Sequence, residues 1–133
     1  MIDGIAFVSA MKTRGMNPAG RRVLLVGAGG VGAAIAYELM RSGVDALADY
    51  DTNENRSDAL VERLHDMALS TKMLRGSWNP QGFDIVINGT PLGIKPDDAL
   101  PVDMKQFEPG MAVADVVSLR QPHCYAMRNR GVL

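Results

Sequence analysis

A cluster of glycines stands early in the chain, in the run Gly27-Ala28-Gly29-Gly30-Val31-Gly32. Glycine at the first position allows a tight turn, and at the third it lets the main chain approach an anionic group. At the sixth it lets a helix pack closely on the preceding strand. N–H groups at the start of that helix would attract phosphates. The pattern therefore predicts a dinucleotide pyrophosphate site. The alternative is a strand-to-helix turn without a ligand, but a bare turn needs only one or two glycines.

Two aspartates, Asp49 and Asp51, compete for a second role about 20 residues further on. An acid at the end of the second strand accepts hydrogen bonds from the adenosine ribose of NAD and repels the extra phosphate of NADP. We favour Asp51 because it is nearer the end of the expected strand; alternatively, both carboxylates only solvate the strand end. Arg56 could hold a phosphate, but no Arg directly follows Asp51. NAD is therefore the expected cofactor, with NADP as the alternative.

Hydrophobic periodicity places the glycine run between a buried strand and an amphipathic helix. Residues 23–26 are consecutive branched apolar residues, as in a strand buried on both faces. The chain is expected to form strands over 22–26, 46–50, 72–78, 83–87 and 111–117, and helices over 6–11, 31–42, 57–70 and 122–130. This alternation predicts an α/β fold: a Rossmann-type open parallel sheet with helices on both faces, in three layers. We expect one NAD(P)-binding domain over residues 1–133, with residues 1–20 as a leading helix and linker.

The composition of the 133-residue chain excludes several classes of function. The formal net charge is −1 and aromatic residues make up 5% of the chain, so no basic field or stacking surface favours nucleic acid. No apolar run approaches the roughly 20 residues that span a membrane, and the first residues lack a signal-peptide layout. The single cysteine, Cys124, permits no internal disulfide, and a cytoplasmic protein is expected. His65 and His123 lack metal-ligand spacing, so no metal site is expected.

Three segments together resemble the shikimate dehydrogenase family, which includes the quinate/shikimate dehydrogenases. Residues 2–8 (IDGIAFV) are similar to the family's Asn-x-Asp-Gly-x-Gly-Phe stretch, and residues 23–36 (VLLVGAGGVGAAIA) to its glycine turn. Residues 84–94 (DIVINGTPLGI) are similar to its Asp-x-Val-Ile-Asn-Ala-Thr-Pro-x-Gly-Met motif, which is more specific than the glycine turn. Residues 113–117 (VADVV) also fit the family's next strand.

The resemblance implies hydride transfer between NAD(P) and a ring hydroxyl of a shikimate-type acid, with a Lys–Asp pair handling the proton. It places Asp3 in the role of the catalytic aspartate, and it implies that Thr90, Pro91 and Gly93 lie along the nicotinamide side. The expected cofactor-binding residues are Gly27, Ala28, Gly29, Gly30, Val31, Gly32, Asp51, Asn88, Thr90, Pro91, Leu92, Gly93 and Val117. NADP-using members usually carry Asn-Arg-Thr where this chain has Asp51-Thr52-Asn53, which again favours NAD.

The chain also departs from the family at its ends. Members carry an N-terminal substrate domain before the Asp-Gly motif, which supplies the catalytic lysine. The expectation is therefore that this domain is absent, and that the chain binds dinucleotide but turns over substrate poorly alone. Shikimate and quinate are its candidate further ligands. Apolar surface left by the missing domain is expected to favour self-association. The alternative hypothesis is a non-catalytic module that binds a dinucleotide or a partner.

Overall fold

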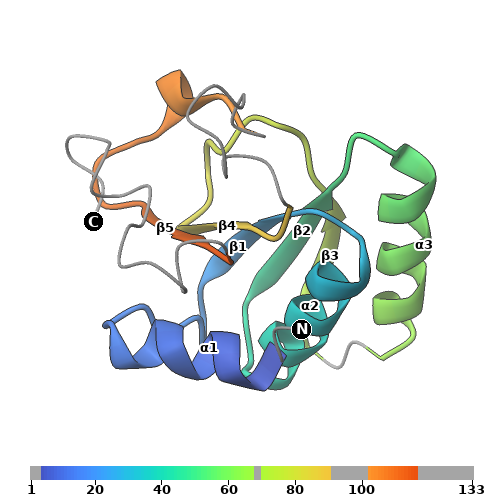
Figure 1. Cartoon of the computed structure of the whole chain (residues 1–133), viewed down its shortest axis with the longest axis horizontal. Coiled ribbons are helices and arrows are strands. Elements are labelled where there is room, and N and C mark those ends of the chain that lie inside the picture. The colour runs from blue at the N-terminus through green and yellow to red at the C-terminus, as the bar shows by residue number, and fades with distance from the viewer. Residues whose placement is uncertain (1–3, 68–69, 91–101, 117–133) are drawn as a thin grey trace.

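The computed structural model describes residues 4–67, 70–90 and 102–116. Helices and strands alternate over residues 4–75, the next element is again a strand, and all described strands meet in a single sheet (Figure 1). The elements are α1 (Gly4–Thr13), β1 (Arg22–Val26), α2 (Gly30–Arg41), β2 (Ala46–Tyr50), α3 (Glu54–His65), β3 (Lys72–Arg75), β4 (Ile85–Asn88), the short 3₁₀ helix η1 (Met104–Gln106) and β5 (Ala112–Asp115).

The sheet is parallel throughout and has the strand order β3-β2-β1-β4-β5. The chain therefore moves outward from β1 to β3 and then returns across the sheet to β4, on the other side of β1. Val26, the last residue of β1, is in register with Tyr50 of β2 and with Asn88 of β4. Ligands of open parallel sheets bind where the strand order reverses, beyond the carboxyl ends of the strands. The expected Rossmann-type open sheet is confirmed.

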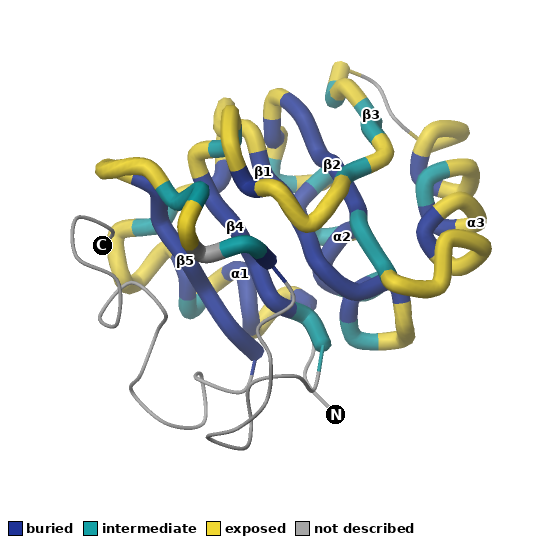
Figure 2. Tube along the Cα trace, turned by 90° about the horizontal axis from the view of Figure 1, so that it is seen from above, coloured by how far each residue is buried: buried dark blue, intermediate teal, exposed yellow. Residues whose placement is uncertain are grey.

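The sheet has a separate apolar core on each face, and its central strands are almost fully buried (Figure 2). On one face the three α-helices pack on alternate strand residues such as Leu25, Leu47 and Ile87. On the other face Val102 and Phe107, which flank η1, pack against Leu24 and its neighbours. The helix expected over 122–130 lies outside the described residues.

Several element boundaries differ from the sequence-based prediction because of local hydrogen bonds. Helix α3 begins at Glu54 rather than Ser57, since the side chain of Asn53 accepts hydrogen bonds from the N–H groups of Asn55 and Arg56 and caps the helix. Helix α2 ends as expected before Gly43, whose φ of +80° closes the helix and returns the chain to β2.

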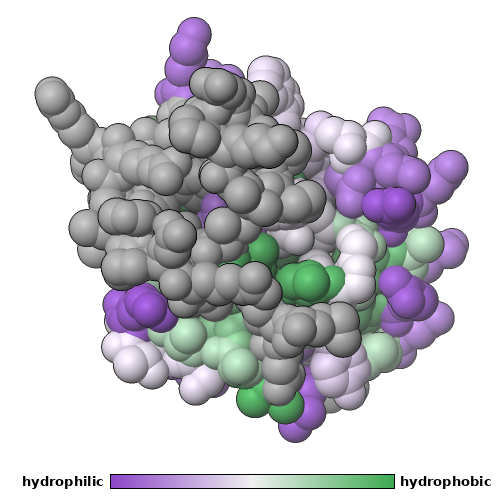
Figure 3. Space-filling view, viewed as in Figure 1, coloured by the Kyte–Doolittle hydropathy of each residue, from purple (hydrophilic) through white to green (hydrophobic). Residues whose placement is uncertain are grey.

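The outer face of α3 is hydrophilic, as the purple side chains around this helix show (Figure 3). Arg75 at the end of β3 forms ion pairs with Glu54 at 3.1 Å and Asp58 at 3.4 Å. These exposed pairs connect the helix to the edge strand and contribute little free energy each. Among the described residues, no helix is long and apolar enough to cross a membrane.

Candidate functional site

The glycine turn connects β1 to α2 at the point where the strand order reverses. Gly27 has a φ of +111°, a region that favours glycine, and its N–H donates to the carbonyl of Tyr50 at 2.7 Å. A Cβ on Gly32 would lie 2.1 Å from the carbonyl oxygen of Gly27. The folding of the turn itself therefore requires glycine at positions 27 and 32.

Gly29 and Gly30 have no such structural requirement. A Cβ built on either residue would meet no described residue within 4 Å, neither glycine has a positive φ, and both are exposed. Gly29 is the N-cap of α2 and provides no side-chain cap. The N-terminus of a 12-residue helix is thus open to an incoming group, and its partial positive charge suits an anion.

The structure places Asp51 beside this turn. Its Oδ2 accepts a hydrogen bond from the N–H of Ala28 at 2.8 Å, and its Oδ1 accepts one from the N–H of Asn53 at 2.8 Å. The carboxylate therefore ties the end of β2 to the glycine turn, and it remains partly exposed. Asp51 thus lies beside the glycine turn, and its role toward a ligand stays a prediction.

Asp49 has a different environment. It is 0% exposed in the core, and neither of its carboxyl oxygens has a hydrogen-bond partner among the described residues. The hydroxyl of Ser57 donates instead to the main-chain carbonyl of Asp49, at 2.9 Å. Burial raises the pKa of Asp49 to about 7, and the nearby charge of Asp51 acts in the same direction. Asp49 cannot contact a ligand at the sheet edge without a rearrangement of the core.

The segment after β4 lies against the glycine turn. The N–H of Gly89 donates to the carbonyl of Val26 at 2.7 Å, and a Cβ on Gly27 would lie 3.0 Å from the methyl carbon of Thr90. Thr90 in turn donates its N–H, at 3.0 Å, and its hydroxyl to Oδ1 of Asn88. The structure thus brings together the glycine turn, Asp51, Asn88 and Thr90.

Some of the expected site residues cannot be placed. Asp3, Pro91, Leu92, Gly93 and Val117 lie outside the described residues. The residue after Asp3 is informative, because a Cβ on Gly4 would lie 2.3 Å from the carbonyl oxygen of Ala34. Helix α1 therefore begins in close contact with α2, the helix that starts at the glycine turn.

Sequence reasoning missed Asp115 as a site residue. It is the last residue of β5 and is 4% exposed, and its Oδ2 accepts a hydrogen bond from Nδ2 of Asn88 at 3.3 Å. The available signal was its position, since a charged residue that ends an apolar parallel strand lies at the ligand-binding edge of the sheet.

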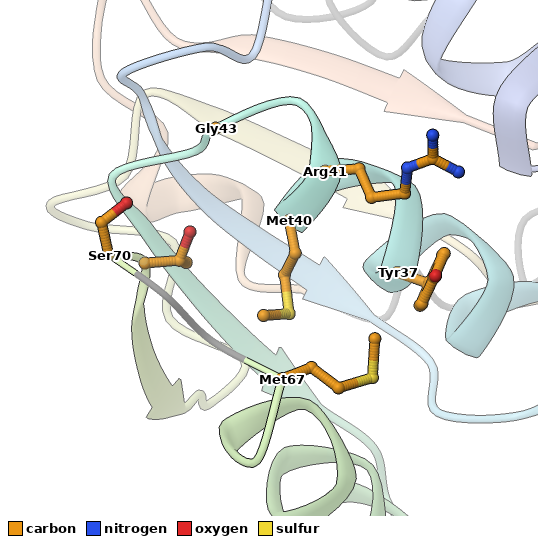
Figure 4. Close-up of a pocket in the computed structure, with 7 residues that line it drawn as sticks. Tyr37, Met40, Arg41, Gly43, Met67 and Ser70 are labelled. Carbon is orange, nitrogen blue, oxygen red and sulfur yellow. The ribbon is translucent and has the colours of Figure 1, made fainter.

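A hollow of about 300 Å³ lies at the opposite edge of the sheet (Figure 4). Gly43 and Thr71, which precede β2 and β3, contribute to it, together with Met40 and Met67. No residue of the glycine turn lines it, so it does not belong to the candidate site. Among the described residues, no group of three His, Cys, Asp or Glu side chains could hold a metal ion.

Comparison with known proteins finds enzymes that are similar to this chain in sequence. No protein-family model matches it. The shikimate dehydrogenase (NADP(+)) of Rubrobacter xylanophilus is 36% identical over 118 residues, which cover 86% of this chain and 42% of the relative. The enzyme of the same name from Acidiphilium cryptum is 33% identical in an alignment that covers 98% of this chain and 47% of the relative. Over most of its length, the chain is homologous to shikimate dehydrogenases.

Solved structures of two other enzymes share the fold of this chain. The ligand-free 5-ketofructose reductase of Gluconobacter sp. strain CHM43 matches with a TM-score of 0.75 and 32% identity, over 89% of this chain and 44% of that protein. The quinate dehydrogenase of Corynebacterium glutamicum in complex with NAD matches with a TM-score of 0.75 and 29% identity, over 88% and 43%. The chain spans less than half the length of each of these relatives.

Proposed function

We propose that this chain binds a nicotinamide dinucleotide through the glycine turn and serves as the cofactor-binding part of a dehydrogenase. The observation that carries the proposal is the open space at Gly29 and Gly30. Packing explains the glycines at 27 and 32 but gives no reason for those at 29 and 30. A pyrophosphate that approaches the main chain at the start of α2 would give that reason.

The reaction we propose is reversible hydride transfer between the nicotinamide ring and a ring hydroxyl of a shikimate-type acid. A bound nicotinamide supplies or accepts the hydride. The protein's own part is to hold the dinucleotide at the carboxyl edge of the sheet and to exchange the proton of the alcohol. We assign that proton exchange to Asp3, on the basis of the family's Asp-Gly motif. Shikimate and quinate are the proposed substrates because relatives named for these acids share the fold.

We propose NAD in preference to NADP. The carboxylate of Asp51 lies next to the glycine turn, where it suits a ribose diol and repels a phosphate. Thr52, which follows it, carries no positive charge. Relatives are named for NADP(+), whereas the matching quinate dehydrogenase was solved with NAD. The finer choice of cofactor therefore rests on Asp51 and Thr52.

Calorimetric titration of the purified chain with NADH and, separately, with NADPH tests the proposal. The variant Gly29→Asp places a carboxylate in the open space, so binding should weaken at least tenfold while the urea unfolding midpoint stays within error. Gln81→Glu adds the same charge at an exposed site in another loop and should bind as the parent does. If the parent binds neither dinucleotide, or if Gly29→Asp binds as tightly as the parent, the proposed site is wrong.

A further inference from the structure

Three polar side chains form a connected chain of hydrogen bonds at the carboxyl ends of β4 and β5, two strands that lie side by side (Figure 1). Asp115 accepts from Nδ2 of Asn88 at 3.3 Å, and Oδ1 of Asn88 accepts from the N–H and the hydroxyl of Thr90. Asn88 is 2% exposed and Asp115 is 4% exposed. We call these three residues the polar relay.

The relay fixes the orientation of the Asn88 amide from both sides. A carboxylate only accepts hydrogen bonds, so Asp115 requires the NH₂ group of Asn88. A main-chain N–H only donates, so Thr90 requires the amide oxygen. Asn88 is buried and in register with Asp115. If its amide were reversed, the amide oxygen would face the Asp115 carboxylate and the NH₂ group would face the N–H of Thr90, so both hydrogen bonds would be lost. The amide has a single favourable orientation.

The orientation of the Asn88 amide determines whether the Thr90 hydroxyl can donate or only accept a further hydrogen bond. This hydroxyl donates its only proton to Oδ1 of Asn88, so toward any further group it can only accept. The methyl group of Thr90 packs toward Gly27, which holds the side chain beside the glycine turn. Asp115 thus acts through Asn88 on the polarity of the partly exposed Thr90 hydroxyl.

We infer that Asp115 is a positioning residue that, through Asn88, presents the Thr90 hydroxyl as an acceptor for a hydrogen-bond donor on the nicotinamide half of the dinucleotide. The inference rests on the proposed function. Two groups on that half have the required chemistry, namely the N–H of the carboxamide and the O–H of the adjoining ribose.

Exchanging the two relay side chains tests the role of Asp115. Asn88→Asp alone places two carboxylates within hydrogen-bond distance, so at pH 8 it should bind NADH at least tenfold more weakly than the parent. At pH 5.5 a shared proton should recover most of that loss, with each variant compared to the parent at the same pH. The double variant Asn88→Asp with Asp115→Asn restores one donor and one acceptor to the bond between these two positions, and it should bind within about threefold of the parent at both pH values. Circular dichroism follows folding throughout.

Thr90 variants test the other end of the relay. Thr90→Ser keeps the hydroxyl and should bind NADH within about threefold of the parent, whereas Thr90→Val should lose about tenfold. The 3-acetylpyridine analogue of NADH lacks the carboxamide N–H. If the carboxamide is the donor, Thr90→Val removes the parent's preference for NADH over this analogue. If the ribose is the donor, both ligands weaken equally.

The outcomes separate the relay from the proposed function. A pH-independent loss in Asn88→Asp, no rescue in the double variant, or unchanged binding by Thr90→Val overturns the relay while dinucleotide binding by the parent stands. Failure of the parent to bind any dinucleotide overturns both.

Discussion

Oδ2 of Asp51 lies 2.8 Å from the main-chain nitrogen of Ala28, so the acid that directly follows β2 also holds the glycine turn. The same carboxylate accepts from Asn53, the N-cap of α3. The side chain of Asp51 therefore connects the turn after β1 to the start of α3. These two hydrogen bonds fix the position of the Asp51 carboxylate, and therefore the place where its charge can act on a ligand.

The charge of Asp51 and the absence of a cation at Thr52 should together determine the choice between NADH and NADPH. Asp51→Asn keeps an acceptor oxygen for Ala28 but removes the charge, and Thr52→Arg adds a phosphate-binding group. We expect the double variant to raise the ratio of NADPH to NADH affinity by at least tenfold, about 1.4 kcal/mol. Parallel titrations with both cofactors measure this ratio.

A matched control tests whether an added arginine must stand at position 52 to change the choice of cofactor. Asn55→Arg adds the same cation on α3, at an exposed site within the same segment. It should change the ratio less than Thr52→Arg does. An equal change would mean that general charge, rather than position 52, governs cofactor choice.

The glycines of the turn should separate into two energetic classes. Gly32→Ala forces a methyl group to within 2.1 Å of the Gly27 carbonyl oxygen, so it should lower the free energy of unfolding by about 3 kcal/mol. The methyl group of Gly30→Ala meets open space in the first turn of α2, so this variant should change the free energy of unfolding by less than about 1 kcal/mol. Urea denaturation of the two variants measures the contrast; similar losses would contradict the packing that we describe.

The contact between α1 and α2 should be equally intolerant of a methyl group. Gly4→Ala places a Cβ 2.3 Å from the carbonyl oxygen of Ala34, so the start of α1 must move away from α2. We expect a loss of about 2 kcal/mol in the free energy of unfolding. Ser9→Ala, at an exposed position of the same helix, is the control and should be nearly neutral. Thermal unfolding followed by circular dichroism distinguishes them.

The sequence predicted the central strands well because their signals are local. The apolar run at 22–26 and the glycines that follow define β1 and its turn without reference to the rest of the chain. The edge strand β3 was expected over 72–78 but ends at Arg75. Its side chains are only partly buried, so its apolar pattern is weak, and pairing with β2 decides where it stops. The role of Asp115 also depends on register, which places it opposite Asn88 and which no local pattern encodes.

Asp49 should make the stability of the protein depend on pH. Its pKa rises from an ordinary 3.8 to about 7 in the folded chain because burial disfavours the charged form. Between these values the folded state holds a proton that the unfolded state has released. Stability is therefore greatest below pH 3.8 as far as this group is concerned, falls as the pH rises toward 7, and then levels off. The full difference is on the order of 4 kcal/mol.

Asp49→Asn removes this titration while keeping the shape of the side chain. The variant should gain stability relative to the parent as the pH is raised from 5 to 8, and the two curves should run parallel above pH 8. Urea denaturation of both proteins at several pH values measures the difference. Asp45→Asn, an exposed acid just before β2, is the control and should follow the parent throughout. A difference between Asp49→Asn and the parent that does not change with pH would show that the Asp49 carboxyl is not protonated in the folded core.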